Sequence, residues 1–298
     1  MITNPLTIGR EDHEKTRLFL QQLDAAMLHL ESKLSVHESV ETIVRALRRV
    51  RMKLARPLRL AIAGELNAGK TTFSNVLIGN TTLPTRAISN TRIPTLIRYS
   101  EKPEIMATFN DGSSRIIRQG DFDDSLEMMR LDVGLPNKLL RSVEVLDCPG
   151  LSDPHILPNN FSIAQYHVDA AVWCTSGTGP WRKSEEDSWL AFPERIRNRS
   201  LLIVTRKDKL DEDSQHKILL RLRHEVKGLF NEIVFMSSTD ALHSYEIEMD
   251  PLAVWRYSGG QELDLKLSTL IARIQDHRYE TAKIVTDRLT NKFLKLLS

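Results

Sequence analysis

The sequence lacks most features that would assign it to a specialised class of protein. It has only two cysteines, Cys148 and Cys174, so it has no disulfide framework, and a reducing compartment is indicated. No apolar run approaches the roughly twenty residues needed to cross a bilayer, and residues 1–15 carry no signal-peptide core. The formal net charge of +2 does not by itself imply a nucleic acid or an anionic membrane as partner. These absences predict a cytoplasmic globular protein, with no nucleic-acid partner.

The chain does contain ample material for a large buried core. Of its 298 residues, 41% are hydrophobic, which suffices for one large or two modest domains. Short apolar runs alternate with helical segments in the middle of the chain, and this order is typical of a parallel sheet covered on both faces. The strands expected there are Leu58–Ala63, Ile93–Tyr99, Val143–Leu146, Val168–Cys174, Leu201–Val204 and Ile233–Met236, with a hairpin at 104–109 and 114–118. The predicted fold class is therefore α/β, with a mostly parallel sheet between two helical layers.

Helices are predicted at both ends of the chain. Residues 11–56 contain no glycine or proline and repeat apolar residues every three or four positions, which fits either one long amphipathic helix or two. The same spacing continues beyond Gly260 to the end of the sequence. We therefore expect an N-terminal helical segment at 1–56, an α/β domain at 57–260 and a C-terminal helix at 261–298. The two terminal segments are expected to pack together as a helical bundle.

The most specific motif lies between the first predicted strand and the helix that follows it. Residues 64–71 fit the phosphate-loop pattern G-x-x-x-x-G-K-[ST], and Gly79 is expected to cap the helix that the loop begins. Such a loop directs backbone N–H groups and a helix N-terminus at one anion. A nucleoside triphosphate with Mg²⁺ is the expected ligand, and the fold is that of a P-loop NTPase. The residues predicted to contact the nucleotide here are Gly64, Asn67, Ala68, Gly69, Lys70, Thr71 and Thr72.

A second motif supplies the metal ligands and the terminal-phosphate contact. Asp147 follows a predicted buried strand, at the sheet edge where α/β proteins bind ligands, so with Thr71 it is expected to hold Mg²⁺. Gly150 is expected to offer its backbone N–H to the terminal phosphate. Thr91, in a polar loop, is the threonine predicted to close on the metal, with Thr85 and Thr95 as alternatives. Lys70, Thr91 and Gly150 are the candidate catalytic residues.

A third motif points to the base. Residues 205–208, Thr-Arg-Lys-Asp, follow a predicted strand and resemble the guanine-reading pattern [NT]-K-x-D of GTPases, with Arg206 where the pattern has lysine. Thr205, Arg206 and Asp208 are therefore predicted to contact the nucleotide. The Asp208 carboxylate can accept two hydrogen bonds from guanine, which adenine cannot offer. Ser237 and Ser238, after the next strand, are expected to touch the base through their backbone.

These segments in this order resemble the GTPase domain of bacterial dynamin-family proteins over about residues 58–274. The residues that carry the resemblance are Gly64–Lys70, Leu83–Thr85 with Thr91, Asp147–Gly150, Pro180–Leu190 and Thr205–Asp208. The resemblance implies that the protein hydrolyses GTP to GDP and phosphate with Mg²⁺. It also implies pairing of two GTPase domains, flanking helices that respond to the nucleotide, and an inserted hairpin and helix between Lys70 and Asp147.

The sequence departs from that family in its phosphate loop and in its length. Eukaryotic dynamins have a glutamine that orients the attacking water where this chain has Leu66, and a serine thought to help hold a monovalent cation where it has Asn67. Slow hydrolysis without a dimer is therefore expected. No stalk or lipid-binding tip is expected after Ser298. Because a pair of helices leaves apolar stripes incompletely covered, a third helix is predicted to come from a second N-terminal helix, another copy or a separate helical partner chain. A GTP-gated scaffold with little hydrolysis, and an ATP-using P-loop enzyme, stay open as alternatives.

Two features of the sequence bear on surface contacts. Seven basic residues fall within positions 45–59 without an acid among them, which fits either favourable solvation near a helix C-terminus, the preferred reading, or a peripheral contact with the inner face of a membrane. Trp181 follows Gly-Pro and is predicted to be an exposed contact between GTPase domains.

Overall fold

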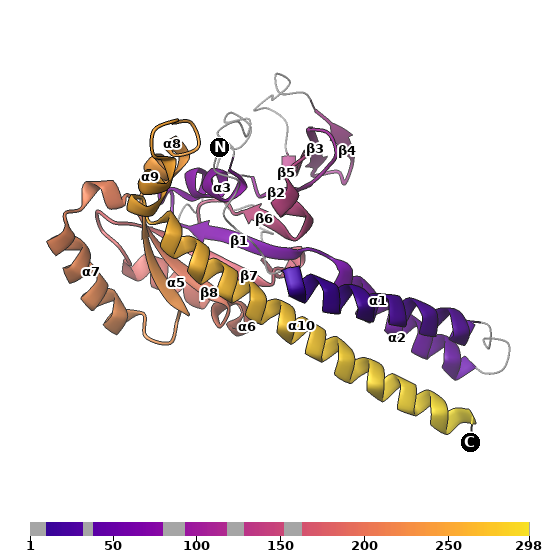
Figure 1. Ribbon diagram of the computed structural model, residues 1–298. Coiled ribbons are helices and arrows are strands. Elements are labelled where there is room, and N and C mark those ends of the chain that lie inside the picture. Colours follow the sequence, from indigo (N-terminus) through magenta and orange to yellow (C-terminus); the bar gives the residue numbers. More distant parts are fainter. Residues whose placement is uncertain (1–9, 32–37, 80–92, 118–127, 152–162, 298) are drawn as a thin grey trace. The chain divides into compact units, whose positions relative to one another are not determined.

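The structure, a computed structural model, describes residues 10–31, 38–79, 93–117, 128–151 and 163–297 (Figure 1). The described residues form two compact units. Residues 57–267 form the sheet unit, and residues 10–56 with 268–297 form the helical unit. Helix α10, Gly260–Leu297, begins in the first unit and ends in the second.

The sheet unit is built on a nine-stranded sheet in the order β4-β3-β5-β2-β6-β1-β7-β8-β9. The last five strands in this order, β6, β1, β7, β8 and β9, are mutually parallel, as the sequence predicts. The strands are β1 Leu58–Gly64, β2 Thr95–Tyr99, β3 Glu104–Phe109, β4 Ser114–Ile116, β5 Met128–Leu135, β6 Val143–Asp147, β7 Ala170–Ser176, β8 Ser200–Thr205 and β9 Glu232–Met236.

The added part of the sheet differs from expectation in one strand. The hairpin of β3 and β4 is present, but β5 lies beside it, antiparallel to β3 and parallel to β2. Charged Arg130 and Asp132 interrupt the apolar run of β5, which hid this strand from a reading of hydrophobic pattern. Their side chains form an ion pair at 2.8 Å, so the buried Asp132 carboxylate is compensated within its own strand.

Helices and short 3₁₀ segments cover the sheet. Trp189, Ile196 and Leu222, from three of the helices, pack with alternate residues of the central strands, including Trp173, in one apolar core. Helix α3 lies against β1 and β6 and ends at Gly79, whose left-handed conformation (φ 63°) closes the helix as expected. The elements are α3 Lys70–Ile78, α5 Lys183–Leu190, α6 Glu194–Arg197, α7 Glu212–Glu225, α8 Ser238–His243, α9 Pro251–Tyr257, η2 Lys138–Arg141, η3 Ile163–Tyr166 and η4 Lys207–Lys209.

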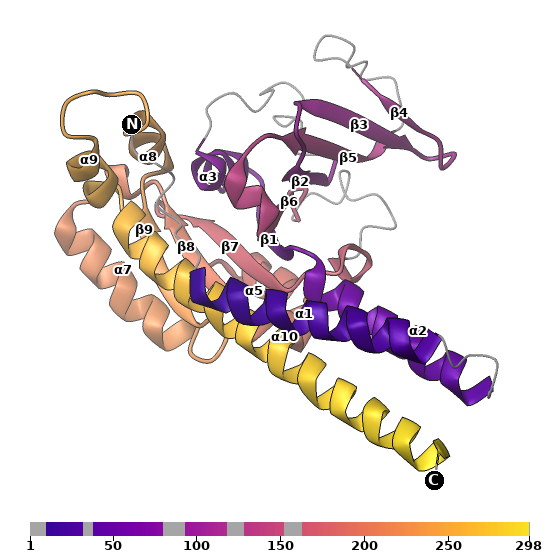
Figure 2. The ribbon, with the colours of Figure 1, turned by 45° about the vertical axis from the view of Figure 1, so that its right-hand side comes forward.

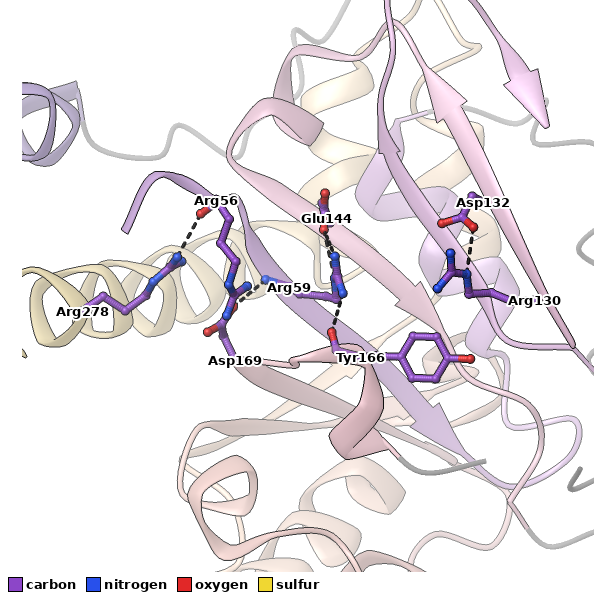
Figure 3. A network of polar contacts seen from close by, with 8 residues as sticks. All are labelled: Arg56, Arg59, Arg130, Asp132, Glu144, Tyr166, Asp169 and Arg278. Atoms are coloured by element: carbon purple, nitrogen blue, oxygen red, sulfur yellow. Dashed lines mark hydrogen bonds and ion pairs between the residues drawn. The ribbon is translucent and has the colours of Figure 1, made fainter. Parts of the chain in front are cut away.

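A cluster of polar contacts around Arg59 fixes the start of β1 to its neighbours. Arg59 forms an ion pair at 2.6 Å with Glu144 of β6 and donates to the carbonyl of Tyr166 in η3 (Figure 3). The backbone N–H of Arg59 also donates to the carboxylate of Asp169, at 2.9 Å. Because β1 leads directly into the phosphate loop, this cluster anchors the strand that carries the site.

The start of α10 is fastened to α9, and through α9 to the segment that follows α8; α8 and α9 lie near this end of α10 in Figure 2. The indole N–H of Trp255 donates to the carboxylate of Asp264 at 2.9 Å, and the Trp255 ring lies 5.6 Å from that of Tyr245. The hydroxyl of Tyr245 donates to the carbonyl of Val76 in the last turn of α3, at 3.2 Å. Rings and hydrogen bonds thus connect the first turns of α10 with the helix that follows the phosphate loop.

Asp264 makes the stability of this unit depend on pH. Burial raises the pKa of Asp264 to about 6, while the hydrogen bond from Trp255 lowers it. A raised folded-state pKa means that the folded protein holds this proton more tightly than the unfolded chain, so its stabilising effect is lost as pH rises from about 4 to 6. Relative to the parent, Asp264→Asn should gain about 1 kcal/mol across that window, allowing for solvent screening. Thermal melts of both proteins from pH 4 to 8 measure this, and a pH-independent difference would contradict it.

The helical unit contains α1, Arg10–Glu31, α2, Glu38–Ala55, and the C-terminal part of α10. The N-terminal stretch therefore forms two helices rather than one. Their apolar stripes meet in a core that Phe293 of α10 completes, so the chain itself supplies a third helix. Arg278 of α10 donates to the carbonyls of Lys53 and Arg56 at the end of α2, the latter at 3.0 Å (Figure 3). No helix among the described residues is sufficiently long and apolar to cross a bilayer.

Acidic partners neutralise much of the basic cluster at 45–59. Arg45, Arg48 and Arg51 form ion pairs with Glu41, Glu31 and Asp24, and Arg59 pairs with Glu144. These pairs favour the interpretation of the cluster as a solvated, internally compensated face.

Candidate functional site

The phosphate loop has the backbone geometry that its sequence requires. Strand β1 ends at Gly64, and a Cβ there would lie 2.3 Å from the carbonyl oxygen of Cys174 on β7, so only glycine fits. Asn67 (φ 61°) and Gly69 (φ 85°) adopt the left-handed conformation and turn the chain into α3, which begins at Lys70. Ala68 is buried within the turn. The N-terminus of α3 therefore faces the space that the loop encloses, where an anion is favoured.

Lys70 is buried beneath this loop. Its ammonium donates to the carbonyl of Glu65 at 2.7 Å, and burial lowers the pKa of Lys70, an effect that the charge of Asp147 opposes. A cation held in a buried site with one carbonyl acceptor is incompletely compensated. A phosphate bound at the head of α3 would supply the missing negative charge.

Two side-chain oxygens that could hold a metal ion meet beside Lys70. The Thr71 hydroxyl donates to Oδ2 of Asp147 at 3.0 Å, joining the first turn of α3 to the end of β6. Oδ1 of Asp147 is buried and has no hydrogen-bond partner among the described residues, and burial raises the pKa of Asp147 to about 6. A carboxylate with an unused buried oxygen beside a hydroxyl fits Mg²⁺, which prefers oxygen ligands and takes few from protein.

The described residues contain no group of three or more His, Cys, Asp or Glu side chains that could hold a metal ion. A Mg²⁺ at Thr71 and Asp147 would therefore complete its coordination with nucleotide phosphates and water, as this ion does at many phosphate-transfer sites.

The segment after Asp147 lies directly against the phosphate loop. A Cβ on Gly150 would lie 3.4 Å from the backbone N and Cα of Leu66, and the Leu151 N–H donates to the carbonyl of Gly64 at 3.3 Å. Cys148 is buried, and burial raises the pKa of its thiol. Leu66 is 43% exposed, and its apolar side chain has no hydrogen-bonding capacity.

The end of β8 is tied to the phosphate loop by two side chains. The buried Thr205 hydroxyl lies 2.9 Å from the carbonyl of Ala68 and 3.1 Å from the carbonyl of Thr175. Arg206, in the left-handed conformation (φ 60°), donates to the carbonyl of Asn67 at 3.1 Å. Arg206 thus makes the phosphate-loop contact expected of the lysine that it replaces.

The other residues predicted at the base lie at the ends of β8 and β9. Asp208 is in η4, and its carboxylate lies 3.3 Å from the ammonium of Lys209. Ser237 caps α8 by accepting a hydrogen bond from the Asp240 N–H, and the buried Ser238 hydroxyl has no partner among the described residues. Because β8 and β9 are parallel neighbours, both loops leave the sheet at the same edge.

Some predicted residues take other positions. Thr91 and its alternative Thr85 lie outside the described residues, whereas Thr95 is buried in β2, opposite Asp147 in the ladder, with its hydroxyl 3.3 Å from the carbonyl of Ile93. Thr72 is half-buried in the first turn of α3.

The prediction for Trp181 is wrong. Its ring is 7% exposed and lies 5.3 Å from Phe230 and 6.4 Å from Trp173, in the core under α5. The preceding Gly-Pro turn directs this ring inward, because the Trp181 backbone N–H donates to the buried Thr175 hydroxyl at 2.9 Å.

Helix α5 supports the phosphate loop, a role that its sequence pattern did not predict. Ser184 donates to the carboxylate of Glu65 at 2.5 Å. Next to it, the buried Glu185 carboxylate accepts from the Trp173 indole and the Thr175 hydroxyl, each at 3.0 Å, and from the Arg182 N–H at 2.9 Å. A glutamate three residues into a helix signals an N-terminus, but Arg182 is not a usual cap, so the pattern was inconspicuous.

Several known proteins resemble this chain. The family model of the dynamin family matches residues 60–187. Dynamin-like protein 2 of Campylobacter jejuni is 26% identical over 204 residues, which cover 65% of this chain and 33% of that protein. Isoniazid-induced protein IniC of Mycobacterium tuberculosis is 36% identical over 113 residues, covering 35% of this chain and 23% of that protein. The chain thus spans a third or less of the length of these curated relatives.

Solved structures share the fold at low sequence identity. A chain of an oligomerised bacterial dynamin pair, described as a mechanism for long-range sensing and tethering of membranes, has a TM-score of 0.66 at 15% identity, covering 96% of this chain and 56% of that chain. LeoA, a bacterial dynamin GTPase from ETEC, has a TM-score of 0.53 at 12% identity, covering 95% of this chain and 48% of that one.

Proposed function

Because residues 60–187 match the model of the dynamin family, we propose that the chain is a dynamin-like protein that binds GTP with Mg²⁺ and hydrolyses it to GDP and phosphate. The observation that carries the proposal is the pair formed by Thr71 and Asp147, with an unused buried carboxylate oxygen, beside the buried ammonium of Lys70 at the head of α3. This set offers one cation and two oxygen ligands to a triphosphate, which is what a metal-assisted phosphate site requires.

Most of the predicted residues have a distinct role in the proposed reaction. Lys70 and the N–H groups of residues 67–72 hold the phosphates, and Gly150 holds the terminal phosphate through its backbone. Bound Mg²⁺, with Thr71, Thr91 and Asp147 as its proposed ligands, would neutralise charge on the phosphate oxygens. Water attacks the terminal phosphorus, the bond from that phosphorus to the bridging oxygen breaks, and GDP leaves. Asp208, Arg206 and the backbone at Ser237 and Ser238 hold the guanine.

We propose that residues 57–260 act as the GTPase domain and that the helical segments 1–56 and 261–298 form a bundle that responds to it. The partner would be a second GTPase domain of this chain, or a separate helical chain, engaged when GTP is bound. The exposed Leu66 supports the need for such a partner. Its side chain cannot orient water, so the reaction would depend on groups that the partner brings.

A GTP-gated scaffold is the second candidate, and Leu66 is the observation that favours it. Single-turnover hydrolysis separates the two functions. For the GTPase, the rate constant per molecule should rise at least tenfold as protein concentration passes through the dimerisation range, with Lys70→Ala as the inactive control. Tight GTP binding with no phosphate release at any protein concentration would leave only the scaffold.

We further propose a cytoplasmic location with peripheral contact to the inner face of a membrane, supported by the membrane-tethering role described for the bacterial dynamin pair. Flotation with liposomes of anionic and of neutral lipid tests this contact. Absence of the protein from both floated fractions at low salt, with and without GTP, would exclude it.

A further inference from the structure

The turn between α9 and α10, Tyr257–Gly260, contacts both loops proposed to hold the base. From the first loop, Lys207 donates through its ammonium to the carbonyl of Tyr257 at 2.5 Å, and the same ammonium lies 5.3 Å from the centre of the Tyr257 ring. From the second, the Ser237 N–H donates to the carbonyl of Ser258 at 2.8 Å. One short turn thus receives a hydrogen bond from each base loop.

The turn is tightly constrained by its surroundings. Gly259 has a φ of 93°, and a Cβ there would lie 2.0 Å from the carbonyl oxygen of Phe235 on β9. A Cβ on Gly260 would lie 2.3 Å from the Trp255 ring. Ser258 is fully buried, and its hydroxyl donates to the carbonyl of Trp255 at 2.7 Å. With no space on either side, the turn can shift only together with β9 and α9.

Helix α10 starts at this turn. The first backbone hydrogen bond across its start runs from the Leu263 N–H to the carbonyl of Gly259, at 3.0 Å. The order of the first turn of α10 therefore depends on the placement of Tyr257–Gly260, and that placement depends on the two base loops.

We infer that Lys207 is a positioning residue that links the guanine site to the start of α10, so that the bound base and the order of the first α10 turn stabilise each other. The inference rests on the proposed GTP binding and adds a regulatory connection at the base. Lys207 does not need to touch the nucleotide, since it acts through the α9–α10 turn. Linkage requires reciprocity: whatever strengthens the turn also strengthens guanine binding.

A purely structural role for Lys207 makes a different prediction. A side chain that merely stabilises the turn would change amide exchange at 257–263 equally in the presence and absence of nucleotide. A coupling residue changes the increment that nucleotide adds. The nucleotide-dependent increment is therefore the decisive quantity.

The test compares hydrogen exchange of the full chain with and without saturating Mg²⁺-GDP. In the parent, GDP should slow exchange both in the phosphate loop, 64–72, and at 257–263. In Lys207→Met, protection of the phosphate loop should remain, the increment at 257–263 should fall by at least half, and the Kd for GDP should rise about fivefold. Lys207→Arg keeps a cationic donor, so the increment at 257–263 and the Kd for GDP should match those of the parent. Lys227→Met is the matched control: it removes one positive charge at an exposed position just after α7 and should behave as the parent.

The outcomes separate this inference from the proposed function. Protection of the phosphate loop in the parent without any change at 257–263, or an unchanged increment in Lys207→Met, overturns the coupling and leaves GTP binding intact. Absence of protection in both segments of the parent overturns nucleotide binding and the coupling with it.

Discussion

Replacing Lys70 with alanine is expected to raise the Kd for Mg²⁺-GTP roughly a hundredfold, or by about 3 kcal/mol. Its ammonium is buried, 2.7 Å from the Glu65 carbonyl, at the head of α3, where a bound phosphate would be its charged partner. A charge pair that forms away from water loses several kcal/mol when one member is removed, because the other stays uncompensated. Isothermal titration calorimetry with GTP and millimolar Mg²⁺ measures the loss.

The stability of the nucleotide-free variant shows whether that loss is specific. Burial lowers the pKa of Lys70, so the charged side chain costs folding free energy when no phosphate is bound. The Tm of nucleotide-free Lys70→Ala should therefore equal or exceed that of the parent, while GTP should raise the Tm of the parent alone. Lys102→Ala, on the exposed turn between β2 and β3, is the matched control. Parent-like GTP affinity in Lys70→Ala would refute the phosphate site.

Asp208→Asn is expected to weaken GTP binding roughly a hundredfold while improving the binding of XTP. Guanine presents two N–H donors to a carboxylate, whereas the amide of asparagine can accept only one and meets the other donor with its own N–H. Xanthine has a carbonyl in place of the guanine amino group, which suits the amide. Competition of GTP, XTP and ATP against a fluorescent GDP analogue measures the change for all three nucleotides.

A nearby substitution of the same kind provides the control. Asp211 lies three residues further along and caps α7 by accepting from the Ser214 N–H at 2.7 Å. Asp211→Asn preserves that cap, since asparagine is an equally good N-cap residue, and should leave the nucleotide preference unchanged. Equal binding of GTP and ATP by the parent would instead support an ATP-using P-loop enzyme and remove the base-reading role of Asp208.

The local motifs carried most of the correct predictions. Residues 58–79 contain a buried strand, a glycine-bounded turn and a capped helix, and all of these are set by neighbours in sequence. The parallel strands β6, β1, β7, β8 and β9 were predicted from their apolar runs for the same reason. The strand β5 did not, because its charges at Arg130 and Asp132 are compensated by pairing with each other, which a hydrophobic pattern cannot register.

Of two predictions about exposure, the structure contradicts one and favours the other. Trp181 looked like a surface contact because it follows Gly-Pro, yet Thr175, Phe230 and Trp173 hold it in the core. For the basic cluster, the structure favours the preferred interpretation of a solvated face, because Glu31 and Asp24 of α1 pair with two of its arginines. In both cases the deciding partners are distant in sequence.

The sequence alone predicted an α/β sheet with a glycine-bounded loop between its first strand and helix, and it proposed which residues are suited to phosphate, metal and guanine. Backbone turns and helix ends depend on a few adjacent residues, so a motif suffices to specify them. The tertiary structure supplied the hydrogen bond between Thr71 and Asp147, two residues that the motifs assign to one metal ion. It alone decided that Thr205 and Arg206 hold the phosphate loop from β8, and that Tyr257–Gly260 joins both base loops to α10. These contacts arise where segments far apart in the chain come together at one edge of the sheet, so the atoms that meet there depend on how the whole sheet is assembled.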